Sequence, residues 1–429
     1  MRYTPLSKNF YTQARQRFSS QLKPGCLAIF CSNDTYPTGA DGHLPFKQAS
    51  DIFYYTGVDQ EESILVVFPQ ATNPAHREIL FLKETSELIA IWEGAKLTKE
   101  QARERTGVST IIWLKDFERT LRTLLAEAEG VYLNDNPHMR ASVEVETREM
   151  RFSKWFRKEF PHYTIHRSAP IGYALRSVKH QEEIDQLQKA IDITRAGFER
   201  TLGFVKPGVM EYEIEAEYMH EFLRRGSRGF AYTPIIASGS SACVLHYIEN
   251  DKPCKDGDLL LMDVGAEYGN YCADMTRCIP VNGKFTDRQK QVYNAVLRVM
   301  KAAKNLLKPG LMMGEYHSAV GEIMTKELID LGLITEDDVK NQNPEWPAYK
   351  KYFMHGTSHF LGIDVHDVGH WHRPIEEGNV FTVEPGIYIP AENLGIRIEN
   401  NIVIRASGNV DLFKDFPTEV EEIESLMAR

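Results

Sequence analysis

Residues 263–277, with the sequence DVGAEYGNYCADMTR, constrain the fold more than any other stretch of this chain. The apolar run DLLLM precedes Asp263, and the central Tyr-Gly-Asn can adopt the backbone angles of a tight turn, so the stretch predicts a β-hairpin. Paired strands would bring Asp263 and Asp274 side by side on one face. Because two carboxylates in a partly buried site repel each other and force one to stay protonated, we expect a cation between them.

The second half of the chain contains an internal repeat. Lys-Pro-Gly occurs at residues 206–208 and again at 308–310. Each copy follows a long amphipathic helical pattern, at about 179–203 and 287–306, and opens another helix. A duplicated helix–turn–helix predicts two similar halves that face each other, and the cleft between such halves is a natural place for a functional site.

Each repeat is followed by a strand-like segment that holds two acids. The first segment contains Asp263 and Asp274, and the second, FTVEPGIYIPAENLGIRIENNIVI at 381–404, contains Glu384 and Glu399. Taken singly, an acid of this kind is more often a turn former or a solvated group than a ligand. The paired hairpins and the duplicated frame together favour a metal site.

A cluster of histidines supports the same interpretation. Residues 355–370, HGTSHFLGIDVHDVGH, contain four of the chain's 14 histidines, and His246 is the counterpart in the first repeat. Four ionised carboxylates would be neutralised by two divalent cations, and two ions ~3.5–4 Å apart would hold a water or hydroxide between them. The oxygen-rich ligand set favours a hard ion such as Mn²⁺. His370 and His372 are interpreted as exposed loop histidines, and residues 335–350 as a surface loop.

Residues 1–170 predict a self-contained α/β domain. Short apolar runs are the expected strands, at 26–32, 64–68, 79–82, 111–114 and 131–133. Helices are expected at 7–22 and at 117–130, the latter with Gly130 as its C-cap. Residues 168–172 resemble a linker, so the second domain is expected to span 171–429. Trp92 is either a packing tryptophan or a lid over a substrate site.

Composition excludes several classes of partner. The net charge of −10 and the pI of about 5.8 argue against nucleic acid and against an anionic membrane surface. No apolar run approaches the ~18 residues of a membrane helix, and the polar N-terminus lacks a secretory signal. The six cysteines have no metal-binding spacing and are expected to be reduced and mostly buried in a cytoplasmic protein.

Four motifs, in this order, resemble the signatures of the pita-bread metallopeptidases of family M24. They are DVGAEYGNYCADMTR, HGTSHFLGIDVHD, TVEPGIYI and GIRIEN, and the resemblance covers residues 170–429. The family includes aminopeptidase P, prolidase, methionine aminopeptidase and creatinase. A separate α/β domain in front matches all of these except methionine aminopeptidase, and the complete set of acids argues against creatinase. The implied catalytic domain is an α+β pita-bread fold with internal pseudo-twofold duplication.

The resemblance also implies roles for individual residues. Its metal ligands fall on Asp263, Asp274, His359, Glu384 and Glu399. It implies that a hydroxide between two metals attacks the substrate and that Glu384 shuttles the proton. His246 and His366 match positions that flank the substrate, and His355 and Arg397 match supporting positions. Arg397 is expected to orient Glu399 by a charge-assisted bond, and Tyr388 to form a wall of a proline pocket.

Within the family, two activities remain as alternatives. Prolidases commonly carry a longer insertion between the two metal-binding glutamates, whereas here only residues 385–398 separate them. This favours an aminopeptidase that releases the N-terminal residue from peptides with proline in second position, over the dipeptidase. A non-catalytic binding protein on the same fold and a purely structural metal site are the remaining alternatives. Co²⁺, Fe²⁺ and Zn²⁺ stay open beside Mn²⁺, and a homodimer or homotetramer is expected.

Overall fold

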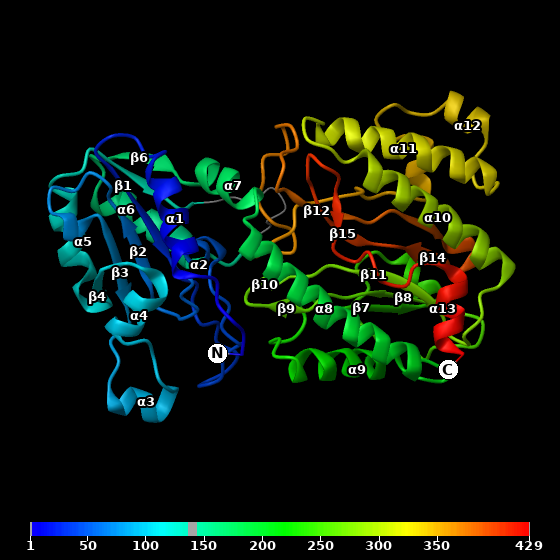
Figure 1. The fold of residues 1–429 in the computed structure, drawn as a ribbon, viewed down its shortest axis with the longest axis horizontal. Coiled ribbons are helices and arrows are strands. Elements are labelled where there is room, and N and C mark those ends of the chain that lie inside the picture. The colour runs from blue at the N-terminus through cyan, green and yellow to red at the C-terminus, as the bar shows by residue number, and fades with distance from the viewer. Residues whose placement is uncertain (1, 136–143, 429) are drawn as a thin grey trace. The chain divides into compact units, whose positions relative to one another are not determined.

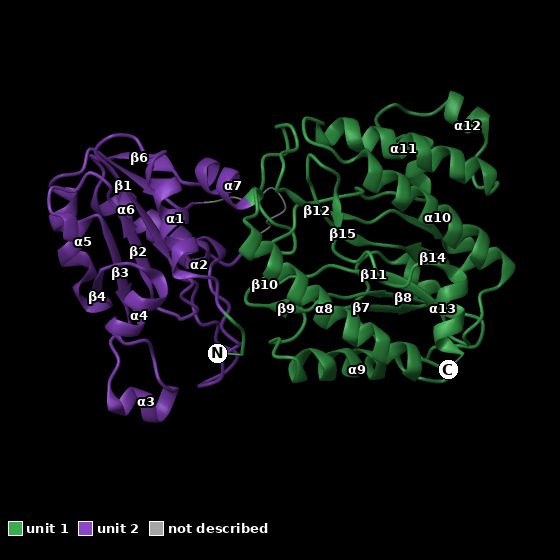
Figure 2. Cartoon of the chain, in the orientation of Figure 1, with its two compact units in different colours: residues 1–4, 177–429 green, residues 5–176 purple. Residues whose placement is uncertain are grey.

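The computed structural model describes residues 2–135 and 144–428 (Figure 1). The chain divides into two compact units, which are residues 5–176 and residues 1–4 with 177–429 (Figure 2). The predicted linker at 168–172 is wrong, because helix α7 (Ala169–Ser177) covers most of it. Pro170 sits in the first turn of α7, where its missing N–H would have had no partner within the helix.

A six-stranded mixed sheet forms the centre of residues 5–176, with the order β4-β3-β2-β1-β5-β6. Its strands are β1 (Cys26–Cys31), β2 (Ile64–Val67), β3 (Glu78–Leu82), β4 (Thr110–Trp113), β5 (Gly130–Leu133) and β6 (Thr164–Arg167). The first five confirm the predicted strands. The sixth was missed because it is a polar, partly exposed edge strand with no apolar run.

Helices accompany this sheet, and two of them correct the sequence reading. They are α1 (Lys8–Ser19), α2 (Ser50–Thr56), α3 (Glu87–Glu93), α4 (Lys99–Thr106), α5 (Phe117–Leu125) and α6 (Arg148–Glu159). Helix α5 ends before Gly130, which instead begins β5 beside β1, because the backbone of Glu129 bonds to Gly25. Trp92 lies on α3 and is 81 % exposed, so it is not a packing tryptophan. Its role as a lid stays a prediction.

In the second unit two helix pairs flank a set of short strands, as expected for the predicted α+β fold with internal duplication. In Figure 1 helix α9 lies below the strands and helix α11 above them. The helices are α8 (Gln181–Phe204), α9 (Glu211–Arg224), α10 (Asp287–Leu306), α11 (Met313–Asp330), α12 (Glu336–Lys340) and α13 (Val420–Met427). Helix α12, capped by Thr335, replaces part of the loop predicted at 335–350, because Thr335 and Asp338 form a capping box.

The duplication extends to the turns that join each helix pair. Gly208 and Gly310 have φ angles of +93° and +89°, which favour glycine. Gly208 N–H donates to the Cys254 carbonyl and Gly310 N–H to the Ile375 carbonyl, at 2.8 and 2.9 Å. Each acceptor residue lies shortly before a strand that leads to an acid of the centre. The two halves therefore dock their helical hairpins on equivalent strands in the same way.

Two further predictions concern side chains and helices across the described chain. All six cysteines are free thiols, and five of them are buried while Cys243 is partly exposed. This confirms the prediction of reduced, mostly buried cysteines. Within residues 2–135 and 144–428, no helix is both long enough and apolar enough to cross a membrane.

Candidate metal centre

The first acidic hairpin confirms the predicted turn but is interrupted by two breaks. Strand β8 (Leu259–Asp263) pairs with β11 (Thr276–Pro280), and an inner pair, β9 (Glu267–Tyr268) and β10 (Tyr271–Cys272), lies between them. Gly269 and Asn270 form the tight turn with φ angles of +60° and +68°. Asp263 ends β8 and Asp274 lies in the break before β11. Asp263 is still paired, with Thr276 and with Ile235, at the end of the ladder, whereas Asp274 lies in the break, and the two carboxylates come together at this end of β8 and β11.

The second hairpin repeats this plan. The outer strands β12 (Val380–Val383) and β15 (Asn400–Val403) pair, and so do the inner strands β13 (Gly386–Ile389) and β14 (Leu394–Arg397). Glu384 follows β12, and Glu399 lies between β14 and β15. Pro385, which lacks a backbone N–H, follows Glu384 and helps to keep the ladder open there. The strand breaks thus place an acid pair from each half in equivalent positions.

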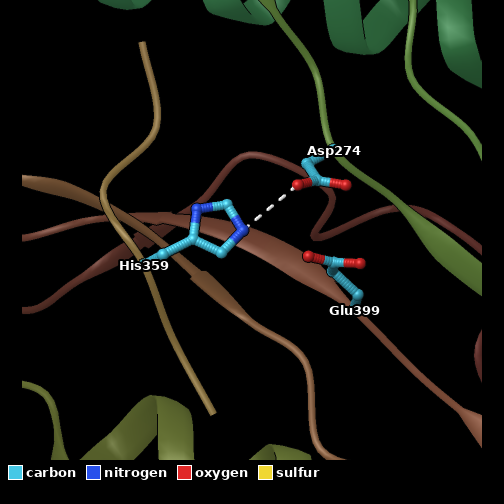
Figure 3. A group of neighbouring side chains, drawn as sticks. All are labelled: Asp274, His359 and Glu399. Carbon is cyan, nitrogen blue, oxygen red and sulfur yellow. Dashed lines mark ion pairs between the residues drawn. The ribbon is translucent and has the colours of Figure 1, made fainter. Parts of the chain in front are cut away.

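Three of the predicted ligands come together in one buried group. Ligand atoms of Asp274, His359 and Glu399 all lie within 4.8 Å of one another (Figure 3). His359 Nε2 lies 3.4 Å from Asp274 Oδ2 and 3.6 Å from Glu384 Oε1. Glu384 therefore borders the group through His359. Asp263 does not share this group but is linked to it by a tyrosine.

Tyr232 joins the two aspartates of the first half. Its hydroxyl oxygen lies 2.5 Å from Asp263 Oδ1 and 2.7 Å from Asp274 Oδ1. A phenol carries one hydrogen and can donate it to one carboxylate at a time, so the second close oxygen pair needs another positive charge nearby. Sequence reasoning missed Tyr232, which lies in the irregular segment before β7 (Ile235–Ser238) in a stretch without a recognisable motif.

Arg397 is buried and hydrogen-bonds one proposed ligand and two neighbouring hydroxyl groups. The guanidinium donates to Asp263 Oδ2 at 2.6 Å, to Thr276 Oγ1 at 3.0 Å and to the Tyr388 hydroxyl at 2.7 Å. The predicted direct bond from Arg397 to Glu399 is wrong. Instead, the Thr276 hydroxyl donates to Glu399 Oε2 at 2.7 Å and relays the arginine's influence. Arg397 lies on the inner strand β14, and its guanidinium bonds to Asp263 and Thr276 of the first hairpin. These bonds keep it from Glu399.

His355 continues this network as a neutral acceptor. Its Nδ1 lies 2.8 Å from the Gly356 carbonyl, so Nδ1 carries the hydrogen, and Nε2 accepts from the Tyr388 hydroxyl at 2.8 Å. Burial, followed by the charge of Arg397, lowers the pKa of His355 to about 3. Tyr388 is 1 % exposed, so its ring lies beneath His355 and does not form the open pocket wall that the sequence suggested.

Electrostatics disfavours several negative charges here without a cation. Burial raises the pKa of Glu384 to about 7 and that of Glu399 well above its usual value, and Asp274 adds to both effects. Burial also raises the pKa of Asp274, opposed by its bond to His359. Burial alone would lower the pKa of His359, but Asp274 and Glu384 raise it above its usual value. A divalent cation among these groups would restore their ionised forms.

The remaining histidines differ in exposure. The His366 ring stands edge-on to His359, with centroids 4.4 Å apart and an interplanar angle of 88°. His246 is exposed, and its charge also contributes to the low pKa of His355. His372 is exposed as predicted, whereas His370 is half-buried beside Phe360 and Phe381. His366 thus lies beside a proposed ligand, and His246 lies near the supporting residue His355.

The residues present fit a bound cation. Glu399 is 1 % exposed, and its Oε1 has no hydrogen-bond partner among the described residues. An unpaired buried carboxylate oxygen is costly unless a cation binds it. The donor set consists of carboxylate oxygens and one imidazole nitrogen, which suits hard or intermediate divalent ions. Asp274, Glu399 and His359 would hold such an ion, with Asp263 and Glu384 at the edges of the group.

Comparison with known proteins decides the family. Residues 185–406 match metallopeptidase family M24, and residues 11–132 match the aminopeptidase P N-terminal domain. The chain belongs to metallopeptidase family M24. It is 35 % identical to the Xaa-Pro aminopeptidase of Escherichia coli K12 over 98 % of both chains, and 34 % identical to that of Haemophilus influenzae with the same coverage. The structure of aminopeptidase P from E. coli with the inhibitor Pro-Leu matches with a TM-score of 0.88, at 34 % identity and 99 % coverage of both chains.

Membership fixes the class of chemistry. The chain is an enzyme of the Xaa-Pro aminopeptidase class, a hydrolase of the metalloprotease type, built from an aminopeptidase P N-terminal domain and a pita-bread domain. The family assignment implies divalent metal ions, and the Asp274–His359–Glu399 group is a site that could hold one. The creatinase-like alternative and the non-catalytic alternative are therefore both set aside.

Proposed function

We propose that this enzyme releases the N-terminal residue from peptides with proline in second position and does so with two divalent cations. The named relatives support the substrate class, because they are Xaa-Pro aminopeptidases that align along nearly the whole chain. The inhibitor Pro-Leu of the E. coli structure also carries proline. The proposed ligands are Asp263, Asp274, His359, Glu384 and Glu399, and the proposed functional domains are residues 1–170 and 171–429.

The observation that carries the metal proposal is the unpaired oxygen of Glu399. Its other oxygen is satisfied by Thr276, and it lies at the meeting point of both halves, because Glu399 N–H donates to the Thr276 carbonyl. Glu399 Oε1 converges with the Asp274 carboxylate of the other half and has no hydrogen-bond partner among the described residues, so a bound cation would satisfy it. Bound divalent cations would polarise the substrate carbonyl and lower the pKa of a bound water.

The protein groups then divide the remaining work. Of the five proposed ligands, Glu384 has the most exposed side chain, at 19 %, so it can meet both the water and the substrate nitrogen. We assign it the proton transfer from the water to the leaving nitrogen. His366 stabilises the charge that develops on the carbonyl oxygen, and His246 holds the substrate from the opposite side.

The supporting residues hold these groups in place. Arg397 fixes Asp263 and, through Thr276, Glu399. His355 keeps the Tyr388 hydroxyl directed so that it can accept from Arg397. A proline at the bond that is cut lacks an N–H, so binding must rely on ring shape and on the groups around the carbonyl.

Mn²⁺ is the cation we propose, because the donors are mainly oxygen. The alternatives are Zn²⁺, Co²⁺ and Fe²⁺, and a zinc-substituted aminopeptidase P of E. coli is among the similar structures. A homodimer or homotetramer and a cytoplasmic location stay predictions from the sequence.

The test uses metal-depleted enzyme and three matched peptides. Xaa-Pro-Yaa, Xaa-Pro and Xaa-Ala-Yaa are assayed before and after addition of Mn²⁺. We expect turnover only with added cation and only when proline is second, with the tripeptide preferred over the dipeptide. Preference for Xaa-Pro would make the enzyme a prolidase. Full turnover without any divalent ion would overturn the metal-dependent mechanism.

A further inference from the structure

A buried ion pair lies directly behind one of the histidines at the centre. Lys179 Nζ lies 2.8 Å from Asp367 Oδ2, and both side chains are 1 % exposed. Asp367 follows His366 in the chain, and the His366 ring stands edge-on to His359. The ion pair therefore fixes the backbone at the residue next to a histidine that the proposed reaction uses.

The pair anchors a closed loop, residues 360–367. The ends of the loop meet where Asp367 N–H donates to the Phe360 carbonyl at 2.9 Å. Its middle is tied to strand β10, because Cys272 N–H donates to the Gly362 carbonyl at 2.9 Å. A Cβ at Gly362 would lie 2.1 Å from Asp367 Oδ2 and 2.8 Å from Lys179 Cε. The charged pair thus packs directly against the loop backbone.

Lys179 is itself part of the framework that carries Glu384. Its N–H donates to the Gly378 carbonyl at 2.8 Å, just before strand β12. The Asn379 side-chain amide donates to the Ser177 carbonyl at 3.0 Å, which holds the same segment from the other side. Strand β12 leads to Glu384, so the ion pair links the His366 loop to the strand of the proposed proton carrier.

We propose that Lys179 and Asp367 are positioning residues that hold His366 in its place against His359. The inference rests on the proposed function, in which His366 stabilises charge on the substrate carbonyl oxygen. Stability alone is a weak reason for such a pair, since apolar side chains of similar volume often stabilise a core equally well. Precise placement of a group that acts in the transition state is a sufficient reason.

The loop that carries His246 is also anchored by the residue after the histidine, here through a neutral hydrogen-bond donor in place of an ion pair. Tyr247 follows His246, is buried, and donates its hydroxyl to Glu211 Oε2 at 2.7 Å. Glu211 is fully buried and also accepts from Ser238 N–H and Lys252 N–H. In each half, the residue after the histidine is thus the buried anchor of its loop. Tyr247→Phe therefore provides a matched control, because it removes the corresponding anchor of the loop that carries His246.

The experiment measures kcat, KM and bound metal for Lys179→Met and Asp367→Asn. Because His366 acts on the transition state, kcat should fall roughly 10–100-fold while KM and metal content change little. Asp367→Asn keeps the side-chain volume and can still accept from Lys179, so it serves as the milder variant if Lys179→Met does not fold. An unchanged kcat in Asp367→Asn and Lys179→Met, or a loss of metal, would overturn the proposal.

A double-mutant cycle with His366→Ala tests whether Lys179 acts on kcat through His366. We expect Lys179→Met to have no further effect on kcat once His366 is absent. Tyr247→Phe, next to the substrate-holding His246, should change KM by the same factor with and without His366. If Lys179→Met lowers kcat by the same factor with and without His366, positioning through His366 is wrong. If His366→Ala alone leaves kcat unchanged, the role of His366 in the proposed function is wrong instead.

Discussion

The two halves of the pita-bread domain bring acids to the centre with unequal support from the protein. In the first half, Asp263 accepts from Arg397, and Tyr232 bridges Asp263 and Asp274. In the second half, Glu399 leaves one buried oxygen unpaired, and Glu384 has the most open side chain. Protein groups thus hold the two aspartates of the first half in place, whereas the two glutamates of the second half need a bound cation to satisfy them.

The largest expected effect follows from the open position of Glu384. Glu384→Gln keeps the shape of the side chain but cannot carry a proton, so kcat should fall ~10²–10⁴-fold. Steady-state kinetics on an Xaa-Pro-Yaa tripeptide checks this. Glu392→Gln, in the same hairpin and paired with Arg288, is the control and should keep full activity. If Glu384→Gln keeps most of its turnover, the assignment of proton transfer to Glu384 is wrong.

A smaller effect is expected when the first half loses its bridge. Tyr232→Phe removes the hydroxyl between Asp263 and Asp274, and loss of such a support should lower metal affinity or activity roughly 10–100-fold. Cation titrations followed by activity measure this. The control is Tyr293→Phe, whose hydroxyl donates to the Thr418 carbonyl and contacts none of the proposed metal ligands among the described residues. Equal behaviour of the two variants would show that the first half is not pre-formed by Tyr232.

Acid should weaken the second half through a half-buried histidine, His317. His317 on α11 accepts from Thr357 N–H at 3.3 Å through Nδ1, and burial, followed by the charge of Lys350, lowers its pKa to about 4. Between pH about 6.5 and 4, the unfolded chain binds the proton and the folded chain does not. Stability is therefore complete above pH about 6.5 and falls as the pH drops towards 4, by on the order of 1–3 kcal/mol.

Urea unfolding at pH 7 and pH 5 tests this acid sensitivity. His317→Gln retains an acceptor but does not titrate, so its stability should change less between the two pH values than that of the wild-type enzyme. His220→Gln, at an exposed position on α9 of the first half, is the matched control for removal of a histidine. An identical pH dependence in wild type and His317→Gln would contradict the assignment.

Sequence patterns predicted the elements whose residues repeat with a period or form a motif. The strands of the front domain, the long helices α8 and α10 and the Gly269-Asn270 turn follow from apolar periodicity and turn chemistry. Polar edge strand β6 lacked such a signal. Residues 168–172 resembled a linker, but most of them lie in helix α7, whose first turn tolerates Pro170.

The centre shows the same limit at the level of side chains. The spacing of the acids indicated that two hairpins converge, and the structure brings Asp274, His359 and Glu399 together. It could not show that Tyr232 joins two aspartates, or that Thr276 stands between Arg397 and Glu399. Such contacts depend on which atoms of distant strands meet, and a single sequence carries no record of this.

The most direct test is a calorimetric titration of metal-depleted enzyme with Mn²⁺, made on the wild type and on Glu399→Gln. The account predicts two ions per wild-type chain and weaker, incomplete binding in Glu399→Gln, because the unpaired oxygen is lost. It also predicts a rise in the melting temperature of about 5–10 °C for the wild type at a free ion concentration near 100 times Kd. Equal binding and an equal rise in both proteins would contradict the claim that acids of both halves converge on a cation centre.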